Sequence, residues 1–142
     1  MSHITSIEIQ VSDLTAFEKA CREVGVELRR EQKTFKSFGG NRVACDMAVA
    51  IPGNRDAYEA GLVRNADGKY TVQVDNWSGG QGLNEKIGHN AGKLLQRYGI
   101  NAATSQALKQ GMSVREEVLA NGQVRLVCTE KPKFATQFAG KF

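Results

Sequence analysis

The stretch RVACDMAVAI, residues 42–51, carries the strongest structural pattern in the sequence. Its bulky apolar side chains fall at every second position, at Val43, Cys45, Met47, Val49 and Ile51. Successive side chains of a strand point to opposite faces of a sheet, so a period of two predicts an extended segment. We predict a central β-strand here and build the rest of the fold outward from it.

Other extended segments lie on both sides of this stretch. After the turn signal Pro52-Gly53-Asn54 a weaker strand is predicted over residues 58–62, and residues 70–74 alternate again after a second turn at residues 65–68. Residues 7–11 alternate apolar and polar side chains, which predicts a half-buried strand. Asn121-Gly122 separates two extended runs and is a strong hairpin signal.

Two segments have helical periodicity. The apolar residues of segment 14–24 recur every three or four positions between Ser12-Asp13 and Gly25, which are residue types that begin and end helices. A second helix is predicted from Leu83 to about Tyr98, and Asn101 is predicted to cap a third, short helix. Residues 26–42 lack a period and predict a surface connection with a short edge strand.

This order of elements predicts the α+β class, with a single antiparallel sheet of five to six strands and two to three helices packed on one face. We expect one domain over residues 1–130, followed by a basic, Phe-containing tail over residues 131–142. The length of 142 residues and net charge of +4 are typical of one globular domain with its own core.

Composition also bears on the compartment. The sequence has neither a signal peptide pattern nor an apolar run long enough for a membrane span, so we expect a cytoplasmic protein without a membrane partner. Its three cysteines, Cys21, Cys45 and Cys128, are widely spaced, and each falls at an apolar position of its pattern. We interpret them as buried thiols in a reducing cytosol, which excludes a disulfide framework.

The sequence offers little catalytic chemistry. Cysteine and histidine lack the spacing of a metal site, and Cys45 with His89 is better explained by a core thiol and a helix residue. Asp46 and Asp75 fall on or beside strands, where a solvated face is the ordinary explanation, and whether they share a cleft with His89 stays open. The run GHNAGKL, residues 88–94, departs from a nucleotide-binding loop and falls within the predicted second helix. We therefore predict no enzyme activity, no cofactor and no metal.

Binding surfaces are the remaining candidates. At helical spacing, Lys86, Lys93 and Arg97 form a positive stripe with His89 beside it. Basic residues 29–36 and the tail lysines Lys131 and Lys133 extend this charge, which suits a phosphate backbone or an acidic protein surface. Trp77 with Gly80 and Gly82, just before the second helix, is a candidate ligand shelf, although flexible entry into the helix and an aromatic anchor between helix and sheet are the more frequent explanations of these residues.

Several stretches resemble a known family. They are the start Met1-Ser2-His3-Ile4-Thr5-Ser6-Ile7, the Asp75-x-Trp77 pair, and the segment from Gln96-Arg97-Tyr98 to the hairpin at residues 122–127. The sequence resembles the proteins of hypothetical chloroplast reading frame thirty-five, known from red-algal plastids, with relatives in cyanobacteria, other bacteria and phages. The likeness covers most of residues 1–129, and residues 29–42, residues 79–82 and the tail depart from it.

The resemblance implies a small α+β domain and carries no catalytic residues. Members are often encoded near an ATPase of the AAA type, which implies an adaptor role. Our first hypothesis is a non-enzymatic cytosolic binding or adaptor domain for a protein partner, with an AAA-type ATPase as a candidate. The alternatives are a nucleic-acid-binding protein that uses the basic helix face and tail, and a binder of a small phosphorylated ligand. Oligomeric state and phage or cellular origin stay open.

Overall fold

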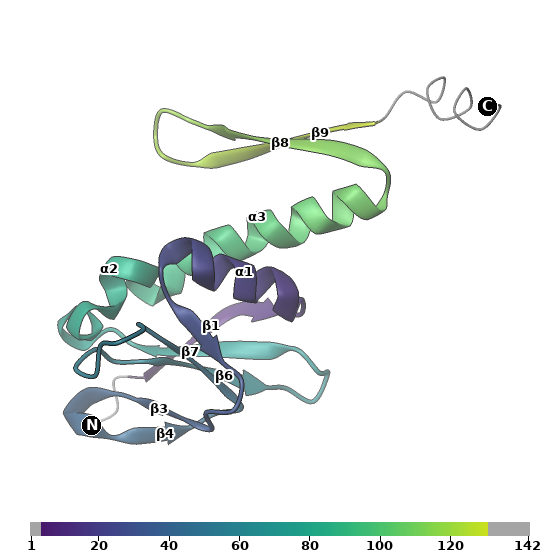
Figure 1. Ribbon diagram of the computed structural model, residues 1–142. Helices are drawn as coiled ribbons and strands as arrows, with labels where there is room; N and C mark the ends of the chain where they lie inside the picture. Colours follow the sequence, from purple (N-terminus) through teal and green to yellow (C-terminus); the bar gives the residue numbers. More distant parts are fainter. Residues whose placement is uncertain (1–3, 131–142) are drawn as a thin grey trace. The chain divides into compact units, whose positions relative to one another are not determined.

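The computed structural model describes residues 4–130. The chain divides into two compact units, Met1–Gly99 and Ile100–Phe142. The expected α+β class is confirmed, because the first unit contains a five-stranded antiparallel sheet together with helices. Figure 1 shows the course of the chain through these elements.

The five-stranded sheet has the order β1-β7-β6-β5-β2. Neighbouring strands are antiparallel throughout, with Leu62 opposite both Met47 and Val72 at the centre of the sheet. The strands are β1 (Ile4–Val11), β2 (Glu27–Arg29), β5 (Met47–Ala50), β6 (Ala60–Arg64) and β7 (Tyr70–Asp75). The predicted strands at residues 7–11, 58–62 and 70–74 thus correspond to β1, β6 and β7.

The predicted single strand over residues 42–51 is wrong in its continuity. The chain forms β4 (Arg42–Ala44), then passes to the main sheet, where β5 lies between β6 and β2. The change of sheet occurs at Cys45, whose N–H donates to Lys33 O, and Asp46, whose N–H donates to Leu62 O, both at 2.8 Å. The alternation of apolar side chains continues across Cys45 and Asp46. It therefore gives no sign that residues 42–51 belong to two different sheets.

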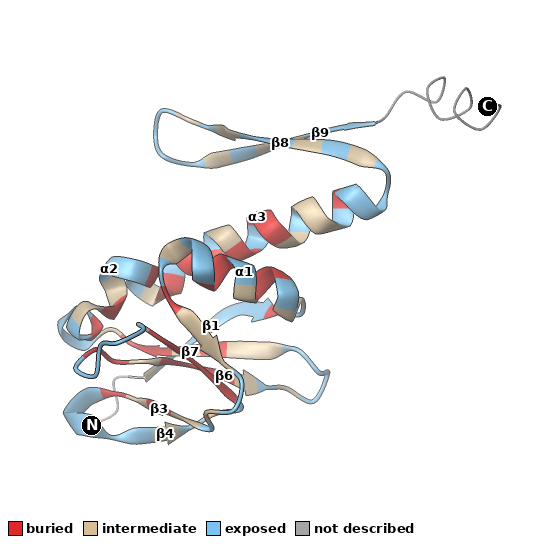
Figure 2. Ribbon diagram, in the orientation of Figure 1, coloured by how far each residue is buried: buried red, intermediate tan, exposed pale blue. Residues whose placement is uncertain are grey.

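Both faces of β5 are covered, and all four of its residues are buried. On one side of the sheet lie α1 (Leu14–Val24) and α2 (Leu83–Ile87), as predicted, and on the other lies the hairpin of β3 (Thr34–Lys36) and β4 (Figure 1). Figure 2 shows buried residues along β6, β7 and one side of α1.

The ring of Phe35 packs against the hairpin-covered face of the sheet. It occupies the space above Gly61, where a Cβ would lie 2.3 Å from Phe35 Cδ1, so only glycine allows this approach. The expected surface connection over residues 26–42 therefore contains a fully buried anchor, Phe35, in addition to the edge strand β2.

The predicted alternation of β1 is interrupted. Ser6 lies opposite Gln73 and Gln10 opposite Thr71, so three residues, 7–9, oppose one residue of β7. This bulge changes which side chains of β1 point toward the core. Ile9, predicted on the buried face with Val11, is 57% exposed.

The second predicted helix is wrong in its boundaries. It is divided into α2, the 3₁₀ turn η3 (His89–Ala91) and α3 (Gly92–Lys109). Gly88 has φ 81° and ψ 166°, a conformation essentially restricted to glycine, and this ends α2. Leu83, Ile87, Ala91 and Leu94 are nonetheless fully buried, which explains why their spacing suggested one helix.

The predicted third helix beginning at Asn101 is also wrong, because α3 continues through this buried residue. The second unit contains the predicted hairpin, formed by β8 (Met112–Val118) and β9 (Val124–Glu130). Gly122 has φ 84° in its turn, a left-handed conformation that glycine adopts without steric cost. These strands pair only with each other among the described residues, so they form a separate sheet.

The cysteines differ in exposure. Cys21 is buried as predicted, Cys45 is half-buried, and Cys128 is exposed, which corrects the expectation of three buried thiols. Cys128 lies in a two-stranded sheet, which has less apolar cover than the core, so alternation did not imply burial. Among the described residues, no helix is both long enough and apolar enough to cross a membrane.

Candidate functional site

A buried carboxylate organises the first candidate site. Asp75, at the end of β7, is 1% exposed. Its Oδ2 accepts a hydrogen bond from Phe38 N and its Oδ1 from Trp77 N, both at 2.9 Å. A carboxylate is costly to bury unless its oxygens are hydrogen-bonded, so these two bonds connect two segments that are 37 residues apart in sequence.

The two N–H donors belong to exposed aromatic residues. Phe38 begins the 3₁₀ turn η1 (Phe38–Gly40), and Trp77 begins η2 (Trp77–Gly82). Their rings lie edge to face, with centroids 5.3 Å apart, and remain 38% and 49% exposed. We call Phe38, Asp75 and Trp77 the aromatic corner. Exposed aromatic residues in a fixed geometry are typical of binding anchors.

The backbone after Trp77 makes a left-handed turn. Ser78, Gly79, Gly80 and Gln81 all have φ between 51° and 65°. For Ser78 and Gln81 this conformation costs roughly 1–2 kcal/mol each. Gly80 O accepts from Tyr58 N at 2.9 Å, and Gly79 O and Gly80 O accept from Leu83 N. These contacts fix the turn beneath the aromatic corner.

An asparagine network joins this turn to the following helices. Asn76 donates through Nδ2 to Asn90 Oδ1 at 2.6 Å, and Asn76 Oδ1 accepts from Asn84 Nδ2 and Asn90 N. Asn90 and Ala91 also have positive φ. With Ser78 and Gln81 they are the four non-glycine residues of this kind among the described residues. Such backbone strain tends to cluster at functional sites.

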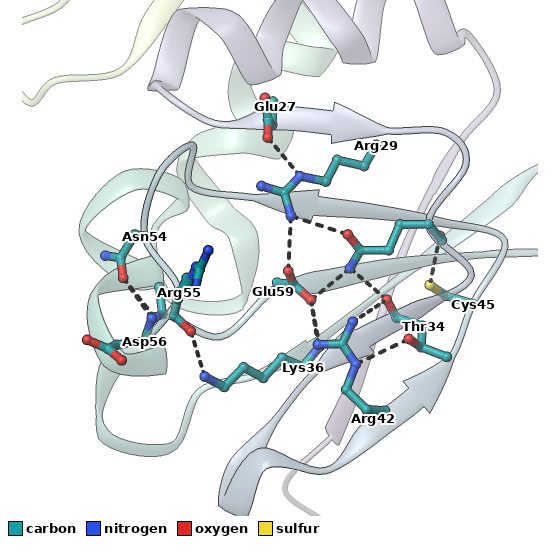
Figure 3. Close-up of polar contacts among 12 residues, drawn as sticks. Glu27, Arg29, Thr34, Lys36, Arg42, Cys45, Asn54, Arg55, Asp56 and Glu59 are labelled. Atoms are coloured by element: carbon teal, nitrogen blue, oxygen red, sulfur yellow. Dashed lines mark hydrogen bonds and ion pairs between the residues drawn. The ribbon is translucent and has the colours of Figure 1, made fainter.

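A second candidate site is a cationic pocket of about 360 Å³. We call it the arginine pocket, and Figure 3 shows its polar contacts. It is lined by Arg29, Lys36, Arg42, Gly53, Asn54, Arg55 and Glu59.

Glu59 holds the walls of the arginine pocket together. Its carboxylate accepts from Gln32 Nε2 at 2.8 Å and from the backbone N–H of Lys36 at 2.9 Å. It also lies 3.4 Å from Arg29 Nη1 and 3.3 Å from Arg42 Nη1. The side chain is only 13% exposed. One carboxylate thus positions two guanidinium groups from different strands.

The predicted positive stripe is not one helical face. Lys86 lies on α2, where its aliphatic chain passes Gly25, and His89 is exposed in η3. Lys93 lies on α3 and donates to Glu85 O at 3.5 Å, while Arg97 pairs with Glu23 at 3.0 Å. The break at residues 88–91 separates Lys86 from the other two.

The predicted ligand shelf is in part the aromatic corner. Trp77 is exposed there, Gly80 is buried beneath it, and Gly82 connects η2 to α2. The aromatic partner of Trp77 is Phe38, whereas Tyr98 packs on Phe17 and accepts from Ser12 N and Asp13 N. Lys131 and Lys133, the tail candidates, lie outside the described residues.

The structure does not bring Asp46 and Asp75 into one cleft. Asp46 Oδ2 accepts from Arg64 N at 2.7 Å, and Arg64 lies opposite Tyr70 at the start of β7. Asp75 is at the other end of this strand, about 17 Å away at the usual rise per residue. Asp46 is exposed and Asp75 is buried, so they have different surroundings.

Two of the thiols, those of Cys21 and Cys45, have a raised pKa. Burial raises the pKa of Cys21 to about 12 and also raises the pKa of Cys45, and a thiol rather than a thiolate is a weak nucleophile. Among residues 4–130, no three His, Cys, Asp or Glu side chains are grouped so that they could hold a metal ion.

Sequence reasoning missed Phe38, Arg55 and Glu59 as site residues. The only sequence signal for Glu59 was its place between the apolar residues Tyr58 and Ala60, which predicts a polar strand face rather than a site. Phe38 and Arg55 had none, since their roles depend on contacts with segments distant in sequence.

The fold and these two surfaces define a small α+β domain with an exposed aromatic corner and a cationic pocket. Residues 20–127 match the family described as "Protein of unknown function (DUF1257)", and the chain belongs to this family. No curated protein and no solved structure matches the chain.

Proposed function

We propose that this protein is a non-enzymatic, cytoplasmic binding or adaptor domain that docks on a protein partner through the aromatic corner. The exposed edge-to-face pair of Phe38 and Trp77, fixed by buried Asp75, carries this proposal. A partner that buries both rings gains apolar contact, and little conformational entropy is lost because the backbone beneath the rings is already ordered.

The resemblance to the hypothetical chloroplast reading frame thirty-five proteins supports the same role. Its Asp75-x-Trp77 pair coincides with two of the three residues of the aromatic corner. The frequent encoding of such proteins near an AAA-type ATPase makes an ATPase of this type the first partner to test.

The two alternative functions have weaker geometric support at their predicted residues. The nucleic-acid alternative uses the basic helix face, which the break at residues 88–91 interrupts, and the tail, which lies outside the described residues. A small-ligand shelf at residues 79–82 would use backbone N–H groups, yet Gly79 N donates to Asn76 O. The protein-partner function does not depend on either feature.

The test is capture of the tagged full-length protein from a lysate of its natural host, with and without nuclease. Wild type is compared with Trp77→Ala, Phe38→Ala and the matched control Ile9→Ala, which removes an exposed apolar side chain elsewhere on the sheet. We expect one defined protein that survives nuclease, is lost with both corner variants and is retained with the control. Its interaction is then reconstituted from purified components.

Trp77 is the single tryptophan of the chain, so its fluorescence reports binding directly in Phe38→Ala and wild type. We expect a blue shift on adding a tryptophan-free segment of the partner. Equal capture by wild type and Trp77→Ala, or capture that disappears with nuclease, would contradict the proposal.

A further inference from the structure

The arginine pocket has an excess of positive charge. Four cationic side chains line it, those of Arg29, Lys36, Arg42 and Arg55, against the single carboxylate of Glu59. The lining side chains have three more positive than negative charges, and Glu27, which pairs with Arg29 Nε at 2.7 Å, reduces the local surplus to two. Like charges held close together repel, and an anion bound among them relieves that repulsion.

The cations are positioned from several directions. Glu59 lies within 3.4 Å of Nη1 atoms of both Arg29 and Arg42, and Arg29 Nε also pairs with Glu27 at 2.7 Å. Lys36 Nζ donates to Arg55 O at 2.7 Å, which attaches β3 to the loop after β5 (Figure 3). Three of the four cationic side chains, those of Arg29, Lys36 and Arg42, are therefore held in place before any ligand arrives.

Arg55 supplies a cation with no internal role. Among residues 4–130 its guanidinium has neither a hydrogen-bond nor an ion-pair partner. Its loop is fixed by Asn54 Oδ1, which accepts from Asp56 N at 3.0 Å and Ala57 N at 3.1 Å. At Gly53 the backbone is open, since a Cβ there would meet no atom within 4 Å. A ligand can approach from this side.

We infer that the arginine pocket binds a phosphate monoester. Guanidinium groups match the geometry of phosphate oxygens, and a dianion offsets more of the surplus charge than a single carboxylate does. Arg55 and Arg42 contact the phosphate, Lys36 contributes charge, and Glu59 acts as a positioning residue for the arginines. This site shares no residue with the aromatic corner and does not rest on the proposed partner function.

The test is an NMR titration of the full-length protein with glycerol 3-phosphate and, separately, with O-phosphoserine amide, at constant ionic strength set with chloride. Both probes are expected to shift the amide signals of Gly53, Arg55 and Lys36 in a saturable manner. If the protein prefers the phosphoserine probe, the natural source is a phosphorylated side chain; if it prefers glycerol 3-phosphate, the source is a metabolite. Either preference supports the pocket.

Substitutions separate the pocket from general electrostatics. Loss of a charged hydrogen bond weakens binding about tenfold or more, so Arg55→Gln and Arg42→Gln are each expected to raise Kd by at least that factor. Arg30→Gln removes one positive charge near the same strands, but Arg30 pairs with Glu18 outside the pocket, so Kd should change less than twofold.

The charge of the ligand gives an independent measurement. The second pKa of a phosphate monoester is about 6, so lowering the pH from 7.5 to 5 converts the dianion to a monoanion and should weaken binding. Three results would contradict phosphate binding in the pocket: amide shifts that chloride alone reproduces, equal changes of Kd in Arg30→Gln and Arg55→Gln, or a Kd that is the same at pH 7.5 and pH 5.

Discussion

Removal of the Asp75 carboxylate is the most direct test of how the aromatic corner is built. Asp75 is 1% exposed and accepts from Phe38 N and Trp77 N at 2.9 Å each. Hydrogen bonds to a charged group contribute about 1.5–3 kcal/mol each. Asp75→Ala leaves both N–H groups without their acceptor, so we expect the free energy of unfolding to fall by about 3–5 kcal/mol.

Asp75→Asn removes one of the two hydrogen bonds and keeps the other. Its amide oxygen still accepts from one N–H, while the amide NH₂ faces the other donor, so we expect a loss of about 1.5–3 kcal/mol. The matched control is Asp46→Ala, because Asp46 also accepts from one backbone N–H, that of Arg64, but is exposed. Water replaces that bond, and we expect a loss below about 1.5 kcal/mol.

The assay is urea unfolding followed by Trp77 fluorescence and far-UV circular dichroism in parallel. A constant m-value across the variants shows that the same cooperative transition is compared. The native emission of Asp75→Asn should also move to longer wavelength, since Trp77 is no longer fixed beside Phe38. If Asp75→Ala costs no more than Asp46→Ala, the carboxylate does not hold the two segments together.

Three further predictions concern packing, backbone conformation and a thiol. Gly61→Ala should lower the free energy of unfolding by about 1–3 kcal/mol, because its Cβ would lie 2.3 Å from Phe35 Cδ1. In a double-mutant cycle, Phe35→Leu should relieve part of this loss, and additive effects of the two substitutions would contradict the contact. Gly88→Ala should lower the free energy of unfolding by about 2–3 kcal/mol in the same urea assay, which is more than Gly122→Ala should. Both positions have positive φ, but only at Gly88 would the added Cβ also lie 2.7 Å from a backbone nitrogen, that of Lys93, so equal losses would refute the steric reason. The pKa of Cys21 is about 12 in the fold against an ordinary value of 9.0, so the thiol's contribution to stability is fully present below pH 9 and is lost as the pH rises toward 12. The urea midpoints at pH 8 and pH 10 should therefore differ less in Cys21→Ala than in wild type. Equal differences in the two proteins would contradict this prediction.

Local patterns in the sequence determined much of the framework. Asp13 caps α1 by accepting from Ala16 N at 3.0 Å, and Gly25 ends it with φ 87°. Both signals act within a few residues, so they are legible without tertiary information. The Asn121-Gly122 hairpin and the alternation in β6 and β7 were predictable for the same reason.

Only the tertiary structure decided where the strands and helices with these side-chain patterns begin and end. The alternation of residues 42–51 suits one strand or two. The choice was made by the carbonyl groups of Lys33, just before β3, and of Leu62 in β6, which accept from the consecutive residues 45 and 46. The apolar spacing of residues 83–98 likewise survives the break at Gly88, because the same side chains reach the core on either side of it.

Both candidate sites depend on such non-local contacts. The Asp75-x-Trp77 pair is visible in the sequence, but its aromatic partner, Phe38, comes from a turn 37 residues earlier. The arginine pocket joins residues from β2, β3, β4 and the loop between β5 and β6, four segments between positions 29 and 59. A sequence specifies charge, periodicity and caps through neighbours along the chain, whereas the proximity of these groups follows from the order of strands in the folded sheet.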